Sequence, residues 1–166
     1  MLNFGANPPF SYEVFLGKCR DLIPEKDIGI LKTASIAGEY SYGAIEISTL
    51  RKWIEFDTAL RNELVRVRSA RRHIDAQRYL RGDTFTQPSL AHTVMAAYRS
   101  SGLLEAEKAL DQARWQALNE LSAGHFFDLD SLIIYALKLQ ILERWQRINS
   151  ADKTRVLEET LQRGQN

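Results

Sequence analysis

Cysteine is nearly absent from this sequence of 166 residues, which contains only Cys19. A single cysteine excludes a disulfide within the chain and fits a reducing compartment. Nine glycines and four prolines are scattered, so we expect no low-complexity linker and no internal repeat. The longest apolar run, Leu132–Leu137, is far shorter than the roughly 20 residues that span a bilayer. The first ten residues lack the features of a signal peptide, and we expect a cytoplasmic protein, at most peripheral at the cytoplasmic membrane face.

The motifs of metal and cofactor sites are missing as well. The three histidines, His73, His92 and His125, are far apart in the chain, and none belongs to a Glu-x-x-His or His-Glu-x-x-His motif. There is no Cys-x-x-Cys pair, no EF-hand loop and no glycine-rich phosphate loop. Cys19 lies on the apolar side of a predicted helix, which is typical of a buried side chain. We therefore expect no metal and no cofactor.

Charge is balanced overall but unevenly distributed. The 22 basic and 21 acidic side chains give a net charge of +3 over residues 1–102 and of −2 over residues 103–166. The densest basic stretch, Arg61–Arg81, holds seven arginines against two acids. In one part of this stretch, the arginines outnumber the acidic residues near them. This excess predicts a face that docks an anionic partner, through Arg66, Arg68, Arg71 and Arg72. A solvated helix face is the alternative. Because Tyr79 is the only aromatic side chain in the stretch, we expect no nucleic acid partner.

Apolar residues recur at helical spacing along most of the chain, and no pair of strands can be identified. We expect an all-α fold, an irregular bundle of six to eight helices in a single helical domain (1–166), with a mildly basic half (1–102) and a helical core half (103–166). Residues 39–47 are predicted to be a loop. Helices are predicted after Ser11, after Pro24, from Ser48 or Thr49 to Arg72, between Asp75 and Gly82, from Pro88 to before Gly102, over Leu103–Ala123, from Leu129, and, as a last short helix, after Ser150 or Asp152.

Polar residues interrupt the apolar stripes of two predicted helices. Asp57 and Arg61 fall on the apolar side of the first, and Glu107, Asp111 and Arg114 share one face of the second. Buried polar groups are costly unless they are paired. We therefore predict a structural network between the helices, with Asp57 bound to Arg114 and Asp111 bound to Arg61. A catalytic carboxylate pair is the alternative interpretation.

The segment Gly124–Asp128 precedes the most apolar helix of the chain. Asp128 is predicted to cap this helix, and Phe126 and Phe127 are predicted to pack the turn onto the bundle. His125 is interpreted as a hydrogen-bonding residue of the turn, with a proton carrier as the alternative. The helix from Leu129 to Ile148 is apolar on nearly every side up to Leu142, which predicts the central helix of the C-terminal half.

Six phrases of the sequence carry a resemblance to a known family. They are Asn7-Pro-Pro-Phe-Ser-Tyr-Glu-Val-Phe, Ala59-Leu-Arg-Asn-Glu-Leu, Tyr79-Leu-Arg-Gly-Asp, Leu104-Glu-Ala-Glu-Lys-Ala-Leu-Asp-Gln-Ala-Arg-Trp, Gly124-His-Phe-Phe-Asp-Leu-Asp and Tyr135-Ala-Leu-Lys-Leu-Gln-Ile-Leu-Glu-Arg-Trp. Together they resemble an uncharacterised bacterial protein family encoded in V/A-type rotary ATPase operons. The resemblance extends over about residues 3–148. Family members typically begin with a short aromatic segment before a Leu-x-Phe-Gly phrase. Met1–Gly5 starts inside that phrase, so the chain is expected to be a short member or to lack its true start.

The resemblance implies a place in an assembly rather than a reaction. Operons of this kind often lack a recognisable gene for the central-stalk socket, the helical component that joins the stalk to the membrane rotor. A helical protein encoded in the position of that gene looks like a counterpart of the socket. The resemblance thus implies a non-enzymatic subunit or assembly partner of a V/A-type ATPase, and the sequence leaves its oligomeric state open. Two alternatives remain: a small helical enzyme that uses the region of Glu107, Asp111, Arg114 and His125, and a module that binds an anionic surface through Arg66–Arg72.

Overall fold

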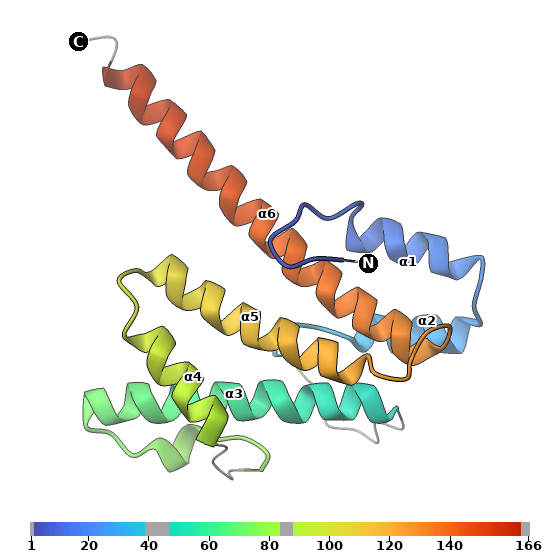
Figure 1. Ribbon diagram of the computed structural model, residues 1–166, viewed down its shortest axis with the longest axis horizontal. Coiled ribbons are helices and arrows are strands. Elements are labelled where there is room, and N and C mark those ends of the chain that lie inside the picture. The colour runs from blue at the N-terminus through green and yellow to red at the C-terminus, as the bar shows by residue number, and fades with distance from the viewer. Residues whose placement is uncertain (1, 39–46, 84–87, 164–166) are drawn as a thin grey trace.

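The computed structural model describes residues 2–38, 47–83 and 88–163, so the predicted loop at 39–47 lies outside the described residues except for Ile47. Six α-helices run through these ranges, with one short 3-10 helix between the third and the fourth (Figure 1). They are α1 (Tyr12–Arg20), α2 (Glu25–Thr33), α3 (Ser48–Arg72), η1 (Ala76–Tyr79), α4 (Pro88–Tyr98), α5 (Leu103–Leu121) and α6 (Leu129–Arg163). No strand occurs in the same ranges, and the predicted all-α bundle is confirmed.

Local sequence signals set several helix ends. The hydroxyl of Ser11 accepts a hydrogen bond from the first turn of α1 (3.2 Å), and the carboxylate of Asp128 does the same for α6 (2.9 Å). Asp75 caps η1 through its side chain as well. α3 ends at Arg72, as predicted, where His73 turns the backbone into the left-handed conformation (φ 53°).

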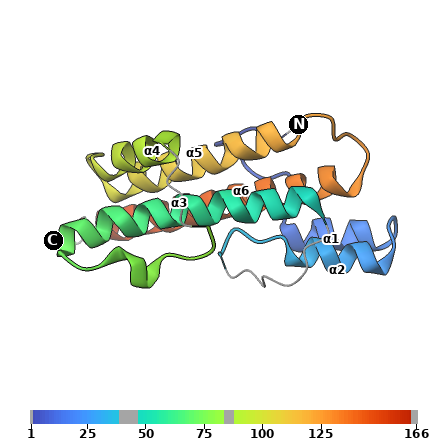
Figure 2. The ribbon, with the colours of Figure 1, turned by 90° about the horizontal axis from the view of Figure 1, so that it is seen from below.

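Two buried apolar clusters hold the helices together. The larger cluster lies between α1, α2, α6 and parts of α3 and α5, and it includes Trp53, Leu118 and Leu137, all fully buried. The smaller cluster joins α3, α4 and α5 through Leu60, Leu90, Val94, Ala97 and Leu110. Figure 2 shows the result: α4 and α5 cover one side of α3, while α1 and α2 pack together at the end where α6 begins.

α6 is one continuous helix of 35 residues, about 52 Å long at 1.5 Å per residue. The prediction of a separate short helix after Ser150 or Asp152 is therefore wrong. No glycine or proline interrupts residues 129–163, and serine and aspartate cost a helix interior only a fraction of a kcal/mol. The part from Ile133 to Leu142 is buried on nearly every side, as predicted for a central helix, and the last turns extend past the other helices (Figure 1). Within the described ranges, neither α6 nor any other helix has the apolar length needed to cross a membrane.

Candidate functional site

The predicted polar network centres on Asp57, a fully buried residue of α3. Each oxygen of its carboxylate accepts a hydrogen bond from a guanidinium group. Oδ1 accepts from Nε of Arg114 on α5 (2.7 Å), and Oδ2 accepts from Nε of Arg61 one turn along α3 (2.6 Å). Asp57 thus pairs with Arg114 across the helix interface, as predicted. Arg114 is itself 5% exposed, so this ion pair lies in the interior.

Asp111, also fully buried, connects the network to α6. Its Oδ1 accepts from Nη1 of Arg114 (2.9 Å) and from Nη1 of Arg144 (3.2 Å). Its Oδ2 accepts from the indole N–H of Trp145 (2.9 Å). The predicted pairing of Asp111 with Arg61 is therefore wrong, because Asp111 faces α6 whereas Arg61 is bound to Asp57.

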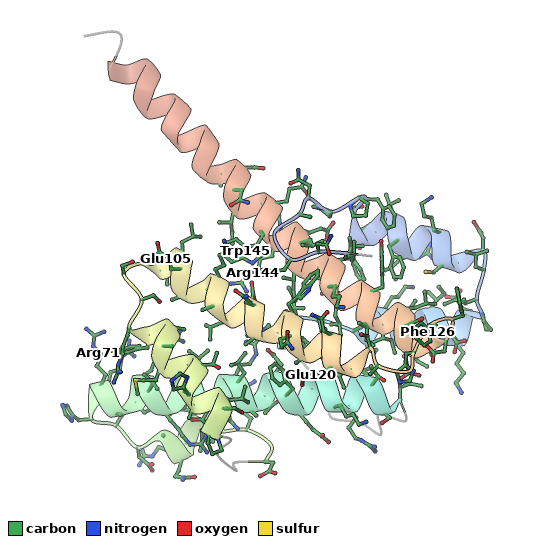
Figure 3. All side chains as sticks on the ribbon, viewed as in Figure 1. Arg71, Glu105, Glu120, Phe126, Arg144 and Trp145 are labelled. Carbon is green, nitrogen blue, oxygen red and sulfur yellow. The ribbon has the colours of Figure 1, made fainter. Side chains whose placement is uncertain are left out.

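Arg144 and Trp145 were not predicted as members of this network. Arg144 binds Glu107 as well as Asp111, and Figure 3 shows both missed side chains on α6, next to α5. A charge count could have found the arginine. The predicted set held three acids, Asp57, Glu107 and Asp111, but only two arginines, and a buried set with an excess negative charge requires another cation.

The electrostatics of the network fit a permanent cross-link. Burial alone would lower the pKa of Arg114, but the charges and hydrogen bonds of Asp57 and Asp111 outweigh it and raise that pKa, so the guanidinium stays charged. No buried side-chain nitrogen or oxygen in the described part of the chain lacks a hydrogen-bond partner. General acid–base chemistry needs a carboxylate that can exchange a proton with a substrate. Both oxygens of Asp57 and of Asp111 are occupied by donors, so the geometry favours the structural interpretation over the catalytic pair.

His125 does not join the network. It follows the end of α5, and Leu121 at that end lies about 15 Å along the helix axis from Asp111. Its Nδ1 lies 2.6 Å from Oδ2 of Asp128. Among the described residues, only His125, Asp128 and Asp130 bring three potential metal ligands within 4.8 Å of one another. However, one carboxylate oxygen of Asp128 pairs with His125 and the other accepts the capping hydrogen bond from Ser131. These contacts account for the positions of His125 and Asp128 without an ion.

The His125–Asp128 pair gives a testable pH dependence. The hydrogen bond with Asp128 raises the pKa of His125 above its usual value of about 6.5. The same bond, together with the N–H of Ser131, lowers the pKa of Asp128. The raised pKa of His125 stabilises the folded state fully below about pH 6.5, and the lowered pKa of Asp128 stabilises it fully above about pH 4. The pair therefore contributes most to stability between about pH 4 and pH 6.5.

We expect Asp128→Asn to lower the pKa of His125 toward 6.5, as measured from the imidazole proton shifts in NMR spectra. Asparagine caps a helix as well as aspartate does, so α6 should remain intact. Asp130→Asn is the control, because Asp130 acts on His125 only through its charge and should change the pKa less. An unchanged His125 titration in Asp128→Asn would show that the hydrogen bond is not formed in solution.

The four arginines of the predicted docking face lie in different surroundings. Arg66 pairs with Glu63 (Nη1 to Oε1, 2.7 Å), and the guanidinium of Arg71 lies 5.9 Å from the ring centre of Tyr98 on α4. Arg68 lines a cavity beside α3, and Arg72 is exposed at the end of that helix. Positions 66 and 68 are about 200° apart around a helix, so these two side chains leave α3 on opposite sides. Docking through all four stays a prediction, and it would have to involve more than one face.

An exposed apolar tip is formed by Phe126 and Phe127, from the turn between α5 and α6, and by Leu22, from the turn between α1 and α2. Leu22 is 81% exposed, Phe126 77% and Phe127 fully exposed. The prediction that the two phenylalanines pack the turn onto the bundle is wrong, because neither is covered by any described part of the chain. The three side chains border a groove of about 330 Å³ that Asp27 and Asp128 also line. Figure 3 shows Phe126 at the opposite end of the molecule from Arg71.

Comparison with known proteins identifies one family. Residues 66–164 match the model of the family described as "Protein of unknown function (DUF2764)". The match covers more than half of the chain, from the last two turns of α3 to the end of α6, so the chain belongs to this family. No curated protein and no solved structure matches the chain.

Proposed function

We propose that this member of the DUF2764 family is a non-enzymatic subunit or assembly partner of a V/A-type ATPase, placed between rotor and stalk at the cytoplasmic face of the membrane. The choice of this ATPase rests on the resemblance carried by the six phrases quoted above. The observation that carries a docking role is the exposed apolar tip at the α5–α6 turn.

The apolar tip has the composition of a binding hot spot. Single exposed leucines are ordinary, but two adjacent phenylalanines beside a leucine and a groove form a contiguous apolar surface. Burying each of these side chains in an interface contributes roughly 1.5–3 kcal/mol. Aromatic anchors that fill a partner's pocket typically dominate such interfaces. A partner that covers the tip therefore gains much of its affinity from Phe126 and Phe127.

The rim of the groove indicates the chemistry of the partner. Asp27 and Asp128 line the groove together with the tip. Charges at a rim steer a partner of opposite sign and set its orientation. We therefore expect the partner to present apolar side chains flanked by lysine or arginine.

The polar network supports a role as a connector. Through Asp57, Arg114 and Asp111, it joins α3, α5 and α6 by hydrogen bonds between charged groups. Both helices that meet at the tip, α5 and α6, belong to this cross-linked frame. The tip is thus carried on a rigid support, which reduces the entropy lost on docking. The enzyme alternative, which uses Glu107, Asp111, Arg114 and His125, is less favoured. Both oxygens of Asp111 accept hydrogen bonds within the network, and His125 pairs with Asp128 outside it.

We expect Phe126→Ser/Phe127→Ser to abolish recovery of ATPase subunits in affinity purification from the native cell. The wild-type chain should recover ATPase head or rotor subunits under the same conditions. Both phenylalanines are exposed, so the double variant should keep the helical circular dichroism and the thermal stability of the wild type.

The matched control is Leu103→Ser/Leu104→Ser at the start of α5. These leucines are 80% and 49% exposed and do not belong to the tip. This control should recover the same subunits as the wild type. If the wild type recovers no ATPase subunit, the assignment to the ATPase is wrong. If the phenylalanine variant recovers as much as the control, the tip is not the contact.

A further inference from the structure

A cavity of about 520 Å³ lies beside α3, where the segment after η1 packs against that helix. Three arginines line it: Arg61 and Arg68 come from α3, and Arg81 comes from the segment after η1. Tyr79, which is 56% exposed, lines it as well. None of the described residues that line the cavity is acidic. The described lining of the cavity is therefore positively charged.

The fold brings these arginines together by two separate means. Arg61 and Arg68 are seven residues apart, about two helical turns, so they lie on the same side of α3. Arg81 is positioned by Asn62, which is 3% exposed. The side-chain amide of Asn62 donates to the backbone carbonyls of Arg81 (2.8 Å) and Asp83 (3.2 Å), and its Oδ1 accepts from the N–H of Arg81 (3.0 Å). A buried side chain thus clamps the segment that carries the third arginine.

The three charges are not equally compensated. Arg61 binds Asp57 through Nε and the carbonyl of Ile36 through Nη2 (2.9 Å). Its guanidinium also packs on Gly38, where a positive φ of 79° favours glycine. By contrast, neither Arg68 nor Arg81 has an acidic partner in the part of the chain that the structure describes. Arg68 and Arg81 therefore line the cavity without an acidic partner among the described residues, while Arg61 is held in place by Asp57 and Ile36.

We propose that this cavity binds a small anion that carries several phosphate groups. The planar fork of arginine matches the oxygens of a phosphate, and charge-assisted hydrogen bonds of this kind are strong. A concave surface with one sign of charge also raises the local concentration of the opposite ion. The volume falls within the range of small-molecule pockets. This inference does not depend on the proposed ATPase role, because the cavity shares no lining residue with the groove at the apolar tip.

The test is a calorimetric titration with inorganic triphosphate and, separately, with ATP. We expect Arg68→Gln/Arg81→Gln to weaken the binding of triphosphate by about tenfold or more, since each substitution removes a charge-assisted hydrogen bond. The matched control is Arg20→Gln/Arg147→Gln, which removes two exposed arginines on α1 and α6, outside the cavity. The control should bind within about twofold of the wild type, because distant surface charges are screened by salt.

A second arm separates the sources of phosphate. The same three proteins are sedimented with vesicles of phosphatidylcholine that contain an anionic phospholipid. Binding of triphosphate or ATP in solution would identify a free ligand, whereas cavity-dependent binding to vesicles alone would identify a lipid headgroup. Absence of binding in both arms would overturn the inference. Equal losses in the cavity variant and in the control variant would overturn it too, since the effect would then be one of net charge.

Discussion

Replacing Arg114 with methionine will lower the free energy of unfolding by about 3–5 kcal/mol. Methionine keeps most of the aliphatic length of arginine but removes the charge. Two fully buried carboxylates, Asp57 and Asp111, would lose the guanidinium that lies between them. Each carboxylate would keep one arginine, Arg61 or Arg144, but those side chains are 39% and 32% exposed. A buried charge that loses its buried partner costs far more than the pair stabilises. Urea denaturation followed by circular dichroism measures the change.

Arg144→Met is the control for this prediction. Arg144 also binds Asp111, but its side chain is 32% exposed, so water can replace part of what is lost. We expect a loss of about 1 kcal/mol or less. A double-mutant cycle with Asp57→Leu and Arg114→Met should show an interaction of about 0.5–3 kcal/mol, because the two residues are in direct contact. A stability of Arg114→Met within about 1 kcal/mol of the wild type would mean that the network is open to water.

Leu137→Ala in α6 should cost about 2–5 kcal/mol through the cavity that it leaves. Leu137 is fully buried in the larger apolar cluster, where the surrounding helices contact α6 from several sides. The loss should appear as a lower denaturant midpoint at an unchanged m-value. Leu103→Ala is the control, because an 80% exposed leucine should change stability by no more than about 0.5 kcal/mol. A loss below about 1 kcal/mol in Leu137→Ala would show that α6 is peripheral.

The helices and the central Asp57–Arg114 pair of the network could be predicted because both depend on local sequence patterns. Capping residues such as Ser11 and Asp128 act within one turn, so the sequence reveals where these helices begin. Polar residues on an apolar stripe reveal that a partner must exist, as they did for Asp57 and Arg114. They do not reveal which partner. That choice depends on how α5 is rotated toward α6, and therefore Asp111 was assigned to the wrong arginine.

The apolar tip and the length of α6 could not be predicted for related reasons. The hydrophobic effect predicts that burial of Phe126 and Phe127 is favourable, but it does not predict whether the residues that bury them belong to the same chain or to a partner. Ser150 and Asp152 favour helix starts, yet the same residue types are tolerated inside a helix that is already formed. Gln140 is a polar residue in the apolar part of α6, and its role becomes clear only from the structure. It interrupts the apolar run of α6 and binds the backbone of Ala34 and Ile36, which ties α6 to the segment after α2.

The placement of the indole rings decides what fluorescence can report. All three tryptophans, Trp53, Trp115 and Trp145, belong to the larger apolar cluster. Their emission should shift to longer wavelength when that cluster is exposed to water. The smaller cluster between α3, α4 and α5 contains none, so a separate opening of α4 would leave the emission unchanged while the helical circular dichroism falls. Coincident transitions by the two probes would show that both clusters unfold as one cooperative unit.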